Sequence, residues 1–353
     1  MDDSRMLHGR WCEDLQCRVK PLLQHTLNLK QIYVGSETMA LTCAVSDGLA
    51  GNARQAEALA RALQPAPITA LHLQARAPWR WAAPHLLPGA DAAFGAEFAR
   101  QLGQPPALAI GCGRQAALAT RLLRAHGSRT VQILDPRLDA RHWDLLIVPE
   151  HDALRGANVI TLLGSLHPVD DTWLTAGRTA FATLGSLPVP RLALLIGGPS
   201  APVPWTTQAL ATLCAHLREQ LHSVGGSLLV TTSRRTPPET ITTLRTLCAD
   251  LPGLMWCDER DGPNPYAGLL GWADAIVATA DSVNLLSEAC ATRVPVAAAF
   301  CDCARGRVRQ YVRALQAHRR LCDTADIFAA QSELTPLRET QRVAALVRER
   351  MHI

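Results

Sequence analysis

The chain has 353 residues, of which 48% are hydrophobic and 19% are charged, and its formal net charge is +4 at pH 7. This composition excludes a disordered or collagen-like chain, and with so modest a charge no nucleic-acid partner is expected. No run of residues approaches the ~18 consecutive apolar positions of a membrane-spanning helix. The first twenty positions are too charged for a signal peptide, so we expect a cytoplasmic protein with reduced cysteines.

The first 38 residues differ in composition from the rest of the chain. Both lysines, Lys20 and Lys30, lie in this segment, whereas every later Lys or Arg position is arginine. An alternating, strand-like pattern begins only at Met39. We therefore expect residues 1–38 to be a disordered extension or a wrongly assigned start, outside the folded domains.

From Met39 onward, short apolar runs alternate with longer helical ones. The first half predicts strands at 41–45, 68–73, 108–111, 130–134 and 145–148, and helices at 52–63, 92–102 and 115–125. Beyond a stretch rich in Gly, Pro, Ser and Thr at 175–190, the second half predicts strands at 192–196, 227–232, 254–256, 276–278 and 295–299, and helices at 206–222, 238–250, 265–273 and 282–292. Such alternation is typical of parallel sheets. The predicted fold class is α/β, with two doubly wound Rossmann-like domains at 39–180 and 181–325, and a C-terminal helix within 326–353.

Three loops of the second half suit a phosphate or a sugar, and each follows a predicted strand, where ligands of such sheets bind. The amides of Gly197-Gly198 can approach an anion, and Ser233-Arg234-Arg235 supplies hydroxyl and guanidinium donors. Thr279-Ala280-Asp281-Ser282 brings hydroxyls and an acid to a helix start. Glu288 lies too far along that helix to cap it, so its carboxylate is free to accept hydrogen bonds from a ribose. The alternatives are a tight turn, solvated arginines and an exposed helix-surface glutamate.

Acids and a histidine follow the strands of the first half. Asp47 comes after the first strand, and Glu150, His151 and Asp152 come after the last. Each suits a base that removes the proton of a hydroxyl group, with Asp47 as the first choice and His151 or Asp152 as the second. The alternative is that Asp47 and Asp152 cap helices or turns. Residues near the same edge, assigned to the acceptor side, are Gly48, Gly51, Asn52, Gln55, Gly113 and Arg114.

One segment also matches a dinucleotide fingerprint. Gly111-Cys112-Gly113-Arg114-Gln115-Ala116 fits the G-x-G-x-x-G/A pattern, and Asp135 ends the next predicted strand, near the place of a ribose-binding acid. Two predicted strands precede this turn, however, whereas the pattern belongs in the first strand-to-helix turn of its sheet. An NAD-dependent nucleotide-sugar epimerase or dehydrogenase is therefore the alternative function.

Several segments, in the same order, resemble the family named for the plant mitochondrial-fission factor "elongated mitochondria", whose bacterial members are assigned as glycosyltransferases of lipooligosaccharide outer core. They are DGLAGNARQ, VQILDPRL, VPEHDALRGANVI, LIGGPS, TTSRRTP and NPYAGLLGWADAIVATADSVNLLSEA. The resemblance runs from about Thr42 to Arg320. It implies a glycosyltransferase fold of the B type, in which the C-terminal domain binds a nucleotide-sugar and the N-terminal domain binds a glycan or glycolipid acceptor.

The arrangement is similar, more loosely, to the enzyme that adds N-acetylglucosamine to a lipid-linked peptidoglycan precursor. That similarity implies a glycine-rich loop at Gly197, Gly198 and Ser200, and a ribose-binding glutamate at Glu288. The whole set assigned to the donor is Gly197, Gly198, Ser200, Ser233, Arg234, Arg235, Asn264, Tyr266, Thr279, Asp281, Ser282, Ser287 and Glu288. By the same analogy, the last helical stretch, 336–350, crosses back to the first domain.

The sequence contains no D-x-D motif, so we expect transfer without a metal or other cofactor, with Arg234 or Arg235, the Gly197-Gly198 amides and Ser282 facing the diphosphate. A lipid-linked acceptor would place the protein at the inner membrane. Pro78-Trp79-Arg80-Trp81 is the candidate for peripheral contact with the bilayer, and a buried loop is its alternative. A third class of function is a non-catalytic scaffold of the fission type, which would bind no nucleotide.

Overall fold

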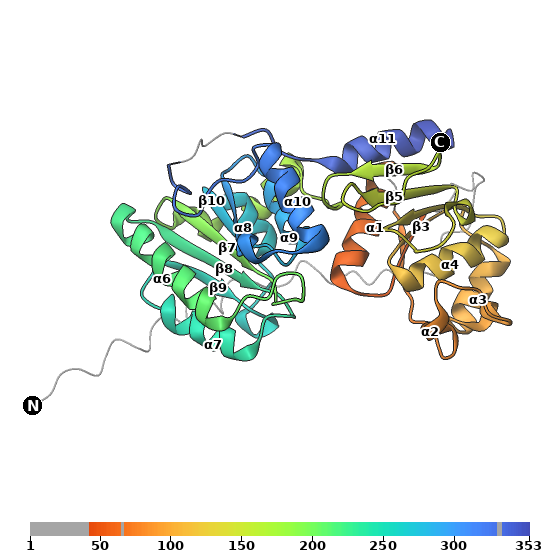
Figure 1. The fold of residues 1–353 in the computed structure, drawn as a ribbon, viewed down its shortest axis with the longest axis horizontal. Helices are drawn as coiled ribbons and strands as arrows, with labels where there is room; N and C mark the ends of the chain where they lie inside the picture. Colours follow the sequence, from red (N-terminus) through yellow and green to blue (C-terminus); the bar gives the residue numbers. More distant parts are fainter. Residues whose placement is uncertain (1–41, 65–66, 330–333) are drawn as a thin grey trace, which may run out of the picture. The chain divides into compact units, whose positions relative to one another are not determined.

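The computed structural model describes residues 42–64, 67–329 and 334–353, so the prediction for residues 1–38 lies outside the described residues. Two parallel sheets organise this part of the chain (Figure 1). Their central strands are buried along almost their whole length, which is expected of parallel strands covered by helices on both faces. The predicted α/β fold class, with two Rossmann-like domains, is therefore confirmed.

The first sheet has six strands in the order β2-β1-β3-β4-β5-β6. Its strands are β1 (Thr42–Ser46), β2 (Thr69–His72), β3 (Leu108–Cys112), β4 (Arg129–Ile133), β5 (Leu145–Pro149) and β6 (Val159–Leu162). Its helices are α1 (Ala50–Leu63), α2 (Trp79–Ala82), α3 (Ala96–Gly103) and α4 (Arg114–Ala125). The strand order reverses between β1 and β3, so the loops that follow these two strands flank the crevice where such sheets bind ligands.

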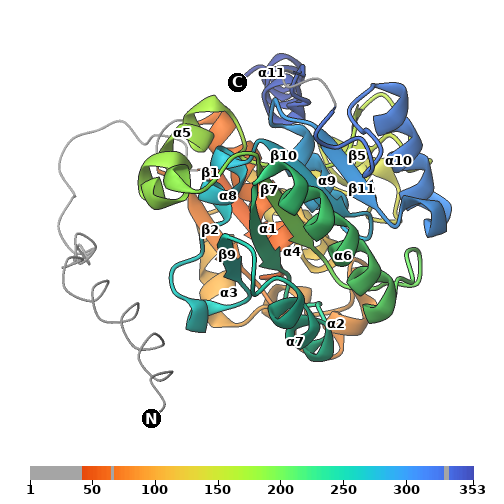
Figure 2. The same ribbon diagram turned by 90° about the vertical axis from the view of Figure 1, so that its left-hand side faces the viewer.

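The second sheet has five strands in the order β11-β10-β7-β8-β9. Its strands are β7 (Arg191–Ile196), β8 (Ser227–Thr232), β9 (Gly253–Trp256), β10 (Ala275–Thr279) and β11 (Val296–Ala299). Its helices are α6 (Thr207–Val224), α7 (Pro238–Leu247), α8 (Tyr266–Trp272), α9 (Val283–Cys290) and α10 (Gly306–Ala317). Helices α6 and α7 lie side by side (Figure 2), joined by a 2.7 Å hydrogen bond between the Thr207 and Thr240 hydroxyls. The order reverses between β7 and β10, where the Gly197-Gly198 and Asp281 loops meet.

The stretch at 175–190 contains more regular structure than its composition indicates. Helix α5 (Asp171–Ala180) begins at Asp170, whose carboxylate accepts from the Trp173 amide at 2.7 Å. Gly177 lets α5 pack closely against α8 and does not form a turn. A Cβ at this position would lie 2.4 Å from the Ala267 carbonyl oxygen of α8. Strand β6 and helix α10 are further elements that the apolar pattern did not predict.

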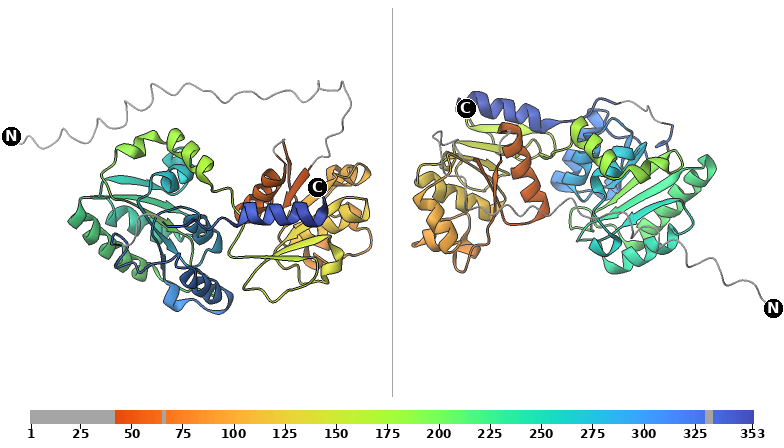
Figure 3. Two further views of the ribbon diagram at one scale, coloured as in Figure 1. Left: turned by 90° about the horizontal axis from the view of Figure 1, so that it is seen from above. Right: turned by 180° about the vertical axis from the view of Figure 1, so that it is seen from behind.

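The last helix, α11 (Glu339–Met351), packs on the first sheet, beside α1 and β6 (Figure 3). Val343, Val347 and Met351 are buried in the same apolar cluster as Leu59 and Ile160. Hydrogen bonds fix its two ends: the Leu163 amide donates to Glu339 Oε2 at 3.1 Å, and Arg348 donates to the carbonyl groups at the end of α1.

Candidate active site

A cavity of about 410 Å³ lies beyond the carboxyl ends of β4, β5 and β6. This volume falls within the range of small-ligand sites. The lining residues come from both halves of the chain: Asn52, Gln55, Leu134, Asp135, Pro149, His151, Asp152, Gly164, Ser165, Val283, Asn284 and Arg307. The structure thus brings His151, Asp152, Asn52 and Gln55, which the sequence predicted, to one place.

Three helices begin at this cavity. Asn52 lies in the first turn of α1, Val283 and Asn284 open α9, and Arg307 opens α10. None of these helices has an acidic residue in its first turn. The amides of Val283 and Asn284 have no acceptor among the described residues. Because helix N-termini carry partial positive charge and free N–H groups, this edge of the cavity suits an anion.

The cavity holds one titratable group suited to taking up a proton at neutral pH. Burial lowers the pKa of His151 below its ordinary value of 6.5, so its imidazole is neutral near pH 7 and can accept a proton. The centre of its ring lies 5.8 Å from the centre of the Tyr311 ring of α10.

Asp152 is buried and paired with a cation. Its Oδ1 lies 2.9 Å from Nη1 of Arg307, and the side chain of Arg307 is 47% exposed. Asp135, the other acid of the cavity, lies 3.4 Å from Nε of Arg137 and accepts from the Arg137 amide at 2.8 Å. The negative charge of each carboxylate is therefore balanced by an arginine. The partial positive charge of the helix starts then makes the cavity favourable for an anion.

The wall on the side of β6 is formed by close packing of the two halves. The Ser165 amide donates to Oγ of Ser287 at 3.1 Å, and that hydroxyl also lies 2.8 Å from the Tyr311 hydroxyl. A Cβ at Gly164 would lie 2.4 Å from the same Ser287 oxygen, which is why only glycine fits there. Oγ of Ser165 is buried with no hydrogen-bond partner among the described residues, and Ser165 is one of the residues that line the cavity.

Asp47, the first choice for the base, forms part of a turn and does not line the cavity. Its carboxylate accepts from the Leu49 amide at 3.1 Å and from Nδ2 of Asn52 at 3.1 and 3.2 Å. This is the capping role given as the alternative in the sequence analysis. The neighbouring Gly48 has a φ of +81°, which a glycine adopts without strain.

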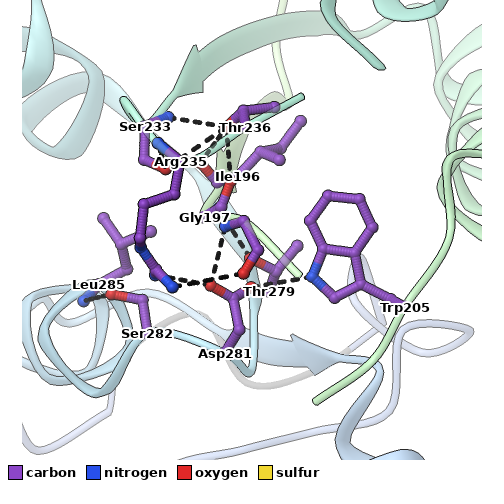
Figure 4. Close-up of polar contacts among 11 residues, drawn as sticks. Ile196, Gly197, Trp205, Ser233, Arg235, Thr236, Thr279, Asp281, Ser282 and Leu285 are labelled. Carbon is purple, nitrogen blue, oxygen red and sulfur yellow. Dashed lines mark hydrogen bonds and ion pairs between the residues drawn. The ribbon is translucent and has the colours of Figure 1, made fainter. Parts of the chain in front are cut away.

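The Gly197-Gly198 loop is filled by the protein itself (Figure 4). Asp281 Oδ2 accepts from the Gly198 amide at 2.9 Å and from Nη2 of Arg235 at 2.8 Å, while its Oδ1 accepts from Nε1 of Trp205 at 3.0 Å. The Gly197 amide donates to Thr279 Oγ1 at 2.8 Å. In this structure a buried carboxylate of the same chain therefore occupies the place predicted for the diphosphate, and binding of a diphosphate to these amides stays a prediction.

Glu288 is also committed to internal partners. Its side chain is 1% exposed, its Oε1 lies 2.7 Å from Nη1 of Arg54 in α1, and its Oε2 accepts from the hydroxyl of Tyr266. The Arg54 guanidinium also lies over the Tyr266 ring, 5.3 Å from its centre. The glutamate is therefore neither exposed nor free to accept from a ribose in this arrangement.

The remaining predicted donor residues have local roles. Ser282 caps α9 through the Leu285 amide at 3.3 Å, and Asn264 accepts from the Tyr266 amide at 3.0 Å. Ser233 accepts from the Arg235 amide at 3.1 Å, whereas Arg234 is exposed. The Ser200 amide donates to the Val203 carbonyl at 3.1 Å.

Among the acceptor-side residues, Arg114 does not reach the cavity. Its guanidinium donates to the carbonyl groups of Trp81, Ala83 and Arg80, at 3.3, 3.1 and 3.2 Å, and so supports the loop around α2. A Cβ at Gly51 would lie 2.3 Å from Nδ2 of Asn284, so Gly51 lies where α1 meets α9.

The dinucleotide fingerprint is also occupied by side chains. A Cβ at Gly113 would lie 2.5 Å from Nδ2 of Asn52, and a Cβ at Gly111 would lie 2.5 Å from Oε1 of Gln132. The glycines of this turn therefore accommodate neighbouring side chains. Nothing in their surroundings favours the NAD-dependent alternative.

Three residues with roles at or near the site were not predicted from the sequence: Arg307, which lines the cavity, and Arg54 and Trp205, which pair with Glu288 and Asp281. Arg307 carried a usable signal, since it opens a helix that follows a strand. Arg54 and Trp205 could not be found from a local sequence pattern, because their partners Glu288 and Asp281 are distant in the chain.

Among the described residues, no three His, Cys, Asp or Glu side chains are gathered to hold a metal ion. In that same part of the chain, every helix is too short or too polar to span a bilayer.

The two parallel sheets and the cavity at their carboxyl edges define a protein of two Rossmann-like domains, as predicted for B-type glycosyltransferases. Residues 50–351 match the family model described as mitochondrial fission ELM1, and the chain belongs to that family. The resemblance drawn from the sequence is thus confirmed.

One curated relative and two solved structures illustrate these similarities. The mitochondrial fission protein ELM1 of Arabidopsis thaliana is 28% identical over 277 residues, which cover 70% of this chain and 64% of the relative's own length. The UDP-GlcNAc 2-epimerase of Neisseria meningitidis bound to UDP-GlcNAc has a TM-score of 0.52 at 11% identity, over 88% of this chain and 99% of that one. The UDP-GlcNAc 2-epimerase of Methanocaldococcus jannaschii has a TM-score of 0.50 at 12% identity, over 89% and 99%. At such identities the two structures show a shared fold.

Proposed function

We propose that this protein is a glycosyltransferase that moves a sugar from a nucleoside-diphosphate donor to a hydroxyl group of a glycan or glycolipid. One observation carries the proposal: the starts of α1, α9 and α10 and the half-buried His151 line a single cavity. The helix starts supply partial positive charge for a diphosphate leaving group, and His151 supplies a base. Arg307, whose charge is shared with Asp152, adds guanidinium N–H donors. A lipooligosaccharide acceptor is what the family resemblance implies, and it stays part of the proposal.

In the proposed reaction the acceptor oxygen bonds to the anomeric carbon of the donor sugar while the bond from that carbon to the diphosphate breaks. The proton of the acceptor hydroxyl passes to the neutral imidazole of His151. The negative charge that grows on the diphosphate is stabilised by the Val283 and Asn284 amides and by the Arg307 guanidinium. Such preorganised donors are typically worth ~3–4 kcal/mol of barrier. This proposal places the donor diphosphate at the start of α9 and not at the Gly197-Gly198 loop, where the sequence had predicted it.

The test is calorimetric titration of the full chain with a panel of nucleoside-diphosphate sugars, followed by measurement of the diphosphate released with a glycan acceptor. Arg307→Met should weaken nucleotide-sugar binding at least tenfold, whereas Arg309→Met, two positions along the same helix, should not. His151→Asn should leave binding intact and slow transfer by ~10²–10⁴-fold. If no nucleotide-sugar binds, or if His151→Asn transfers at the normal rate, the proposal fails.

A non-catalytic role is the second candidate, because the relative from Arabidopsis thaliana is named a fission protein. A scaffold would recruit a partner without using the cavity. It predicts that none of the nucleotide-sugars binds and that Arg307→Met changes neither partner binding nor cell-surface glycan. The two candidates are therefore separated by the same titration.

A further inference from the structure

The exposed large apolar side chains are concentrated at one edge of the first sheet. Six are exposed in the described part of the chain, and three of them, Leu49, Trp81 and Leu86, follow the carboxyl ends of β1 and β2. Trp81 is 69% exposed and Leu86 is 46% exposed, although a large apolar side chain normally packs inside. We call the loop from Gln74 to Ala90, which carries α2, the Trp81 loop.

Two arginines of α4 donate hydrogen bonds to the backbone of the Trp81 loop. Arg114 donates to three of its carbonyl groups, and Arg121 donates to the Pro84 carbonyl at 2.6 Å. From within the loop, Nε1 of Trp79 donates to the Pro88 carbonyl at 3.3 Å. The loop therefore holds Trp81 and Leu86 outward in a fixed arrangement instead of folding them into the core.

The loop is also positively charged. Arg76 and Arg80 are exposed on it, and no acidic residue occurs between Gln74 and Ala90. The Arg80 guanidinium lies 6.0 Å from the centre of the Trp81 ring. A tryptophan and a leucine flanked by arginines fit the interface of an anionic bilayer, where the apolar side chains enter the headgroup region and the guanidinium groups contact phosphates.

We infer that the Trp81 loop docks the protein on an anionic phospholipid surface. Because all strands of the first sheet are parallel, this loop and the candidate cavity lie at the same edge of that sheet. Docking would then present that edge to molecules anchored in the bilayer. The inference stands on exposure and charge alone and does not depend on the reaction proposed for the cavity.

The test is co-sedimentation of the full chain with vesicles of phosphatidylcholine mixed with phosphatidylglycerol, compared with vesicles of phosphatidylcholine alone. We expect partition onto the anionic vesicles that falls as salt is raised. Trp81→Ser should lower this partition about tenfold, and Arg80→Gln about fivefold. The matched controls are Val224→Ser, at a 46% exposed position of α6, and Arg141→Gln, at an exposed arginine between β4 and β5.

Equal partition of Trp81→Ser and the unaltered chain would overturn the inference, as would equal binding to neutral and anionic vesicles. A Trp81-dependent dimer without vesicle binding would assign the loop to a second copy of the chain and would also overturn it. Nucleotide-sugar titration of Trp81→Ser, which should match the unaltered chain, separates a failure of docking from a failure of the cavity proposal.

Discussion

Two carboxylates with almost no solvent contact, Glu288 and Asp281, determine what the second sheet can offer a ligand. Each is held by one arginine and by one polar group of an aromatic side chain: Arg54 and Tyr266 for Glu288, and Arg235 and Trp205 for Asp281. Buried charges need such partners, since an unpaired one is costly. Both acids are therefore paired within the chain in this structure, and the helix starts around the cavity offer amide groups that are not paired with a carboxylate.

The pair between Arg54 and Glu288 should stabilise the contact of α1 with α9. Arg54→Met leaves a buried glutamate with only Tyr266, so we expect the free energy of unfolding to fall by about 1–3 kcal/mol in urea denaturation. Glu288→Gln combined with Arg54→Met should recover part of the loss, because no buried charge remains. Arg141→Met, which removes an exposed ion pair, is the control and should change stability by less than about 0.5 kcal/mol. Equal effects of the two arginine substitutions would contradict this account.

His167 should make stability depend on pH. Burial lowers its pKa from 6.5 to about 4, and the charges facing it are Glu288, Arg338, Arg54 and Glu339. Because the unfolded chain takes up the proton first, stability is complete above about pH 6.5 and falls as the pH drops toward 4, by about 3 kcal/mol in all.

Urea denaturation between pH 7 and pH 4.5 measures this dependence. His167→Gln should flatten the curve in that window, whereas His318→Gln, at an exposed histidine, should leave it unchanged. An unchanged slope in His167→Gln would show that another group is responsible.

At the scale of elements, the loop between β7 and α6 is shaped by the carboxylate that fills it. A Cβ at Gly197 would lie 2.1 Å from Asp281 Oδ2, and the partners of this oxygen leave it no room to move. Gly197→Ala should therefore lower the free energy of unfolding by about 1–3 kcal/mol. Gly103→Ala, at the end of α3 with nothing within 4 Å of the added atom, should be neutral or slightly stabilising. Comparable thermal melting of the two variants would count against the packed loop.

Every described strand except β6, and most of the helices, were predictable because their apolar period is local. The helix at α5 was not predicted, since Gly177 reads as a loop residue until its contact with Ala267 is known. The loops after β7 and β10 were placed correctly, but the internal pairing of Asp281 was not predicted. Trp205 and Arg235 reach Asp281 from other loops of the sheet, and no spacing in the sequence encodes that contact.

At the scale of the whole molecule, the cavity draws on segments that are far apart in the chain. Asn52 and Arg307 both line it, although one opens α1 and the other opens α10. His151 and Asp152 could be predicted as site residues because they follow a strand in the sequence. Their relation to Arg307 and to the start of α9 depends on the packing of the loop after β6 against α9, through Gly164 and Ser287. Local pattern therefore predicted the first-sheet half of the site, and tertiary packing supplied the other half.

The central claim is that a nucleoside diphosphate binds at the helix starts around the cavity. A crystal structure of the chain with a nucleoside diphosphate tests this most directly. The account predicts phosphate oxygens ~3 Å from the Val283 and Asn284 amides and from the Arg307 guanidinium, with Asp281 still bonded to the Gly198 amide. A diphosphate on the Gly197 and Gly198 amides, with the Asp281 carboxylate displaced, would contradict it.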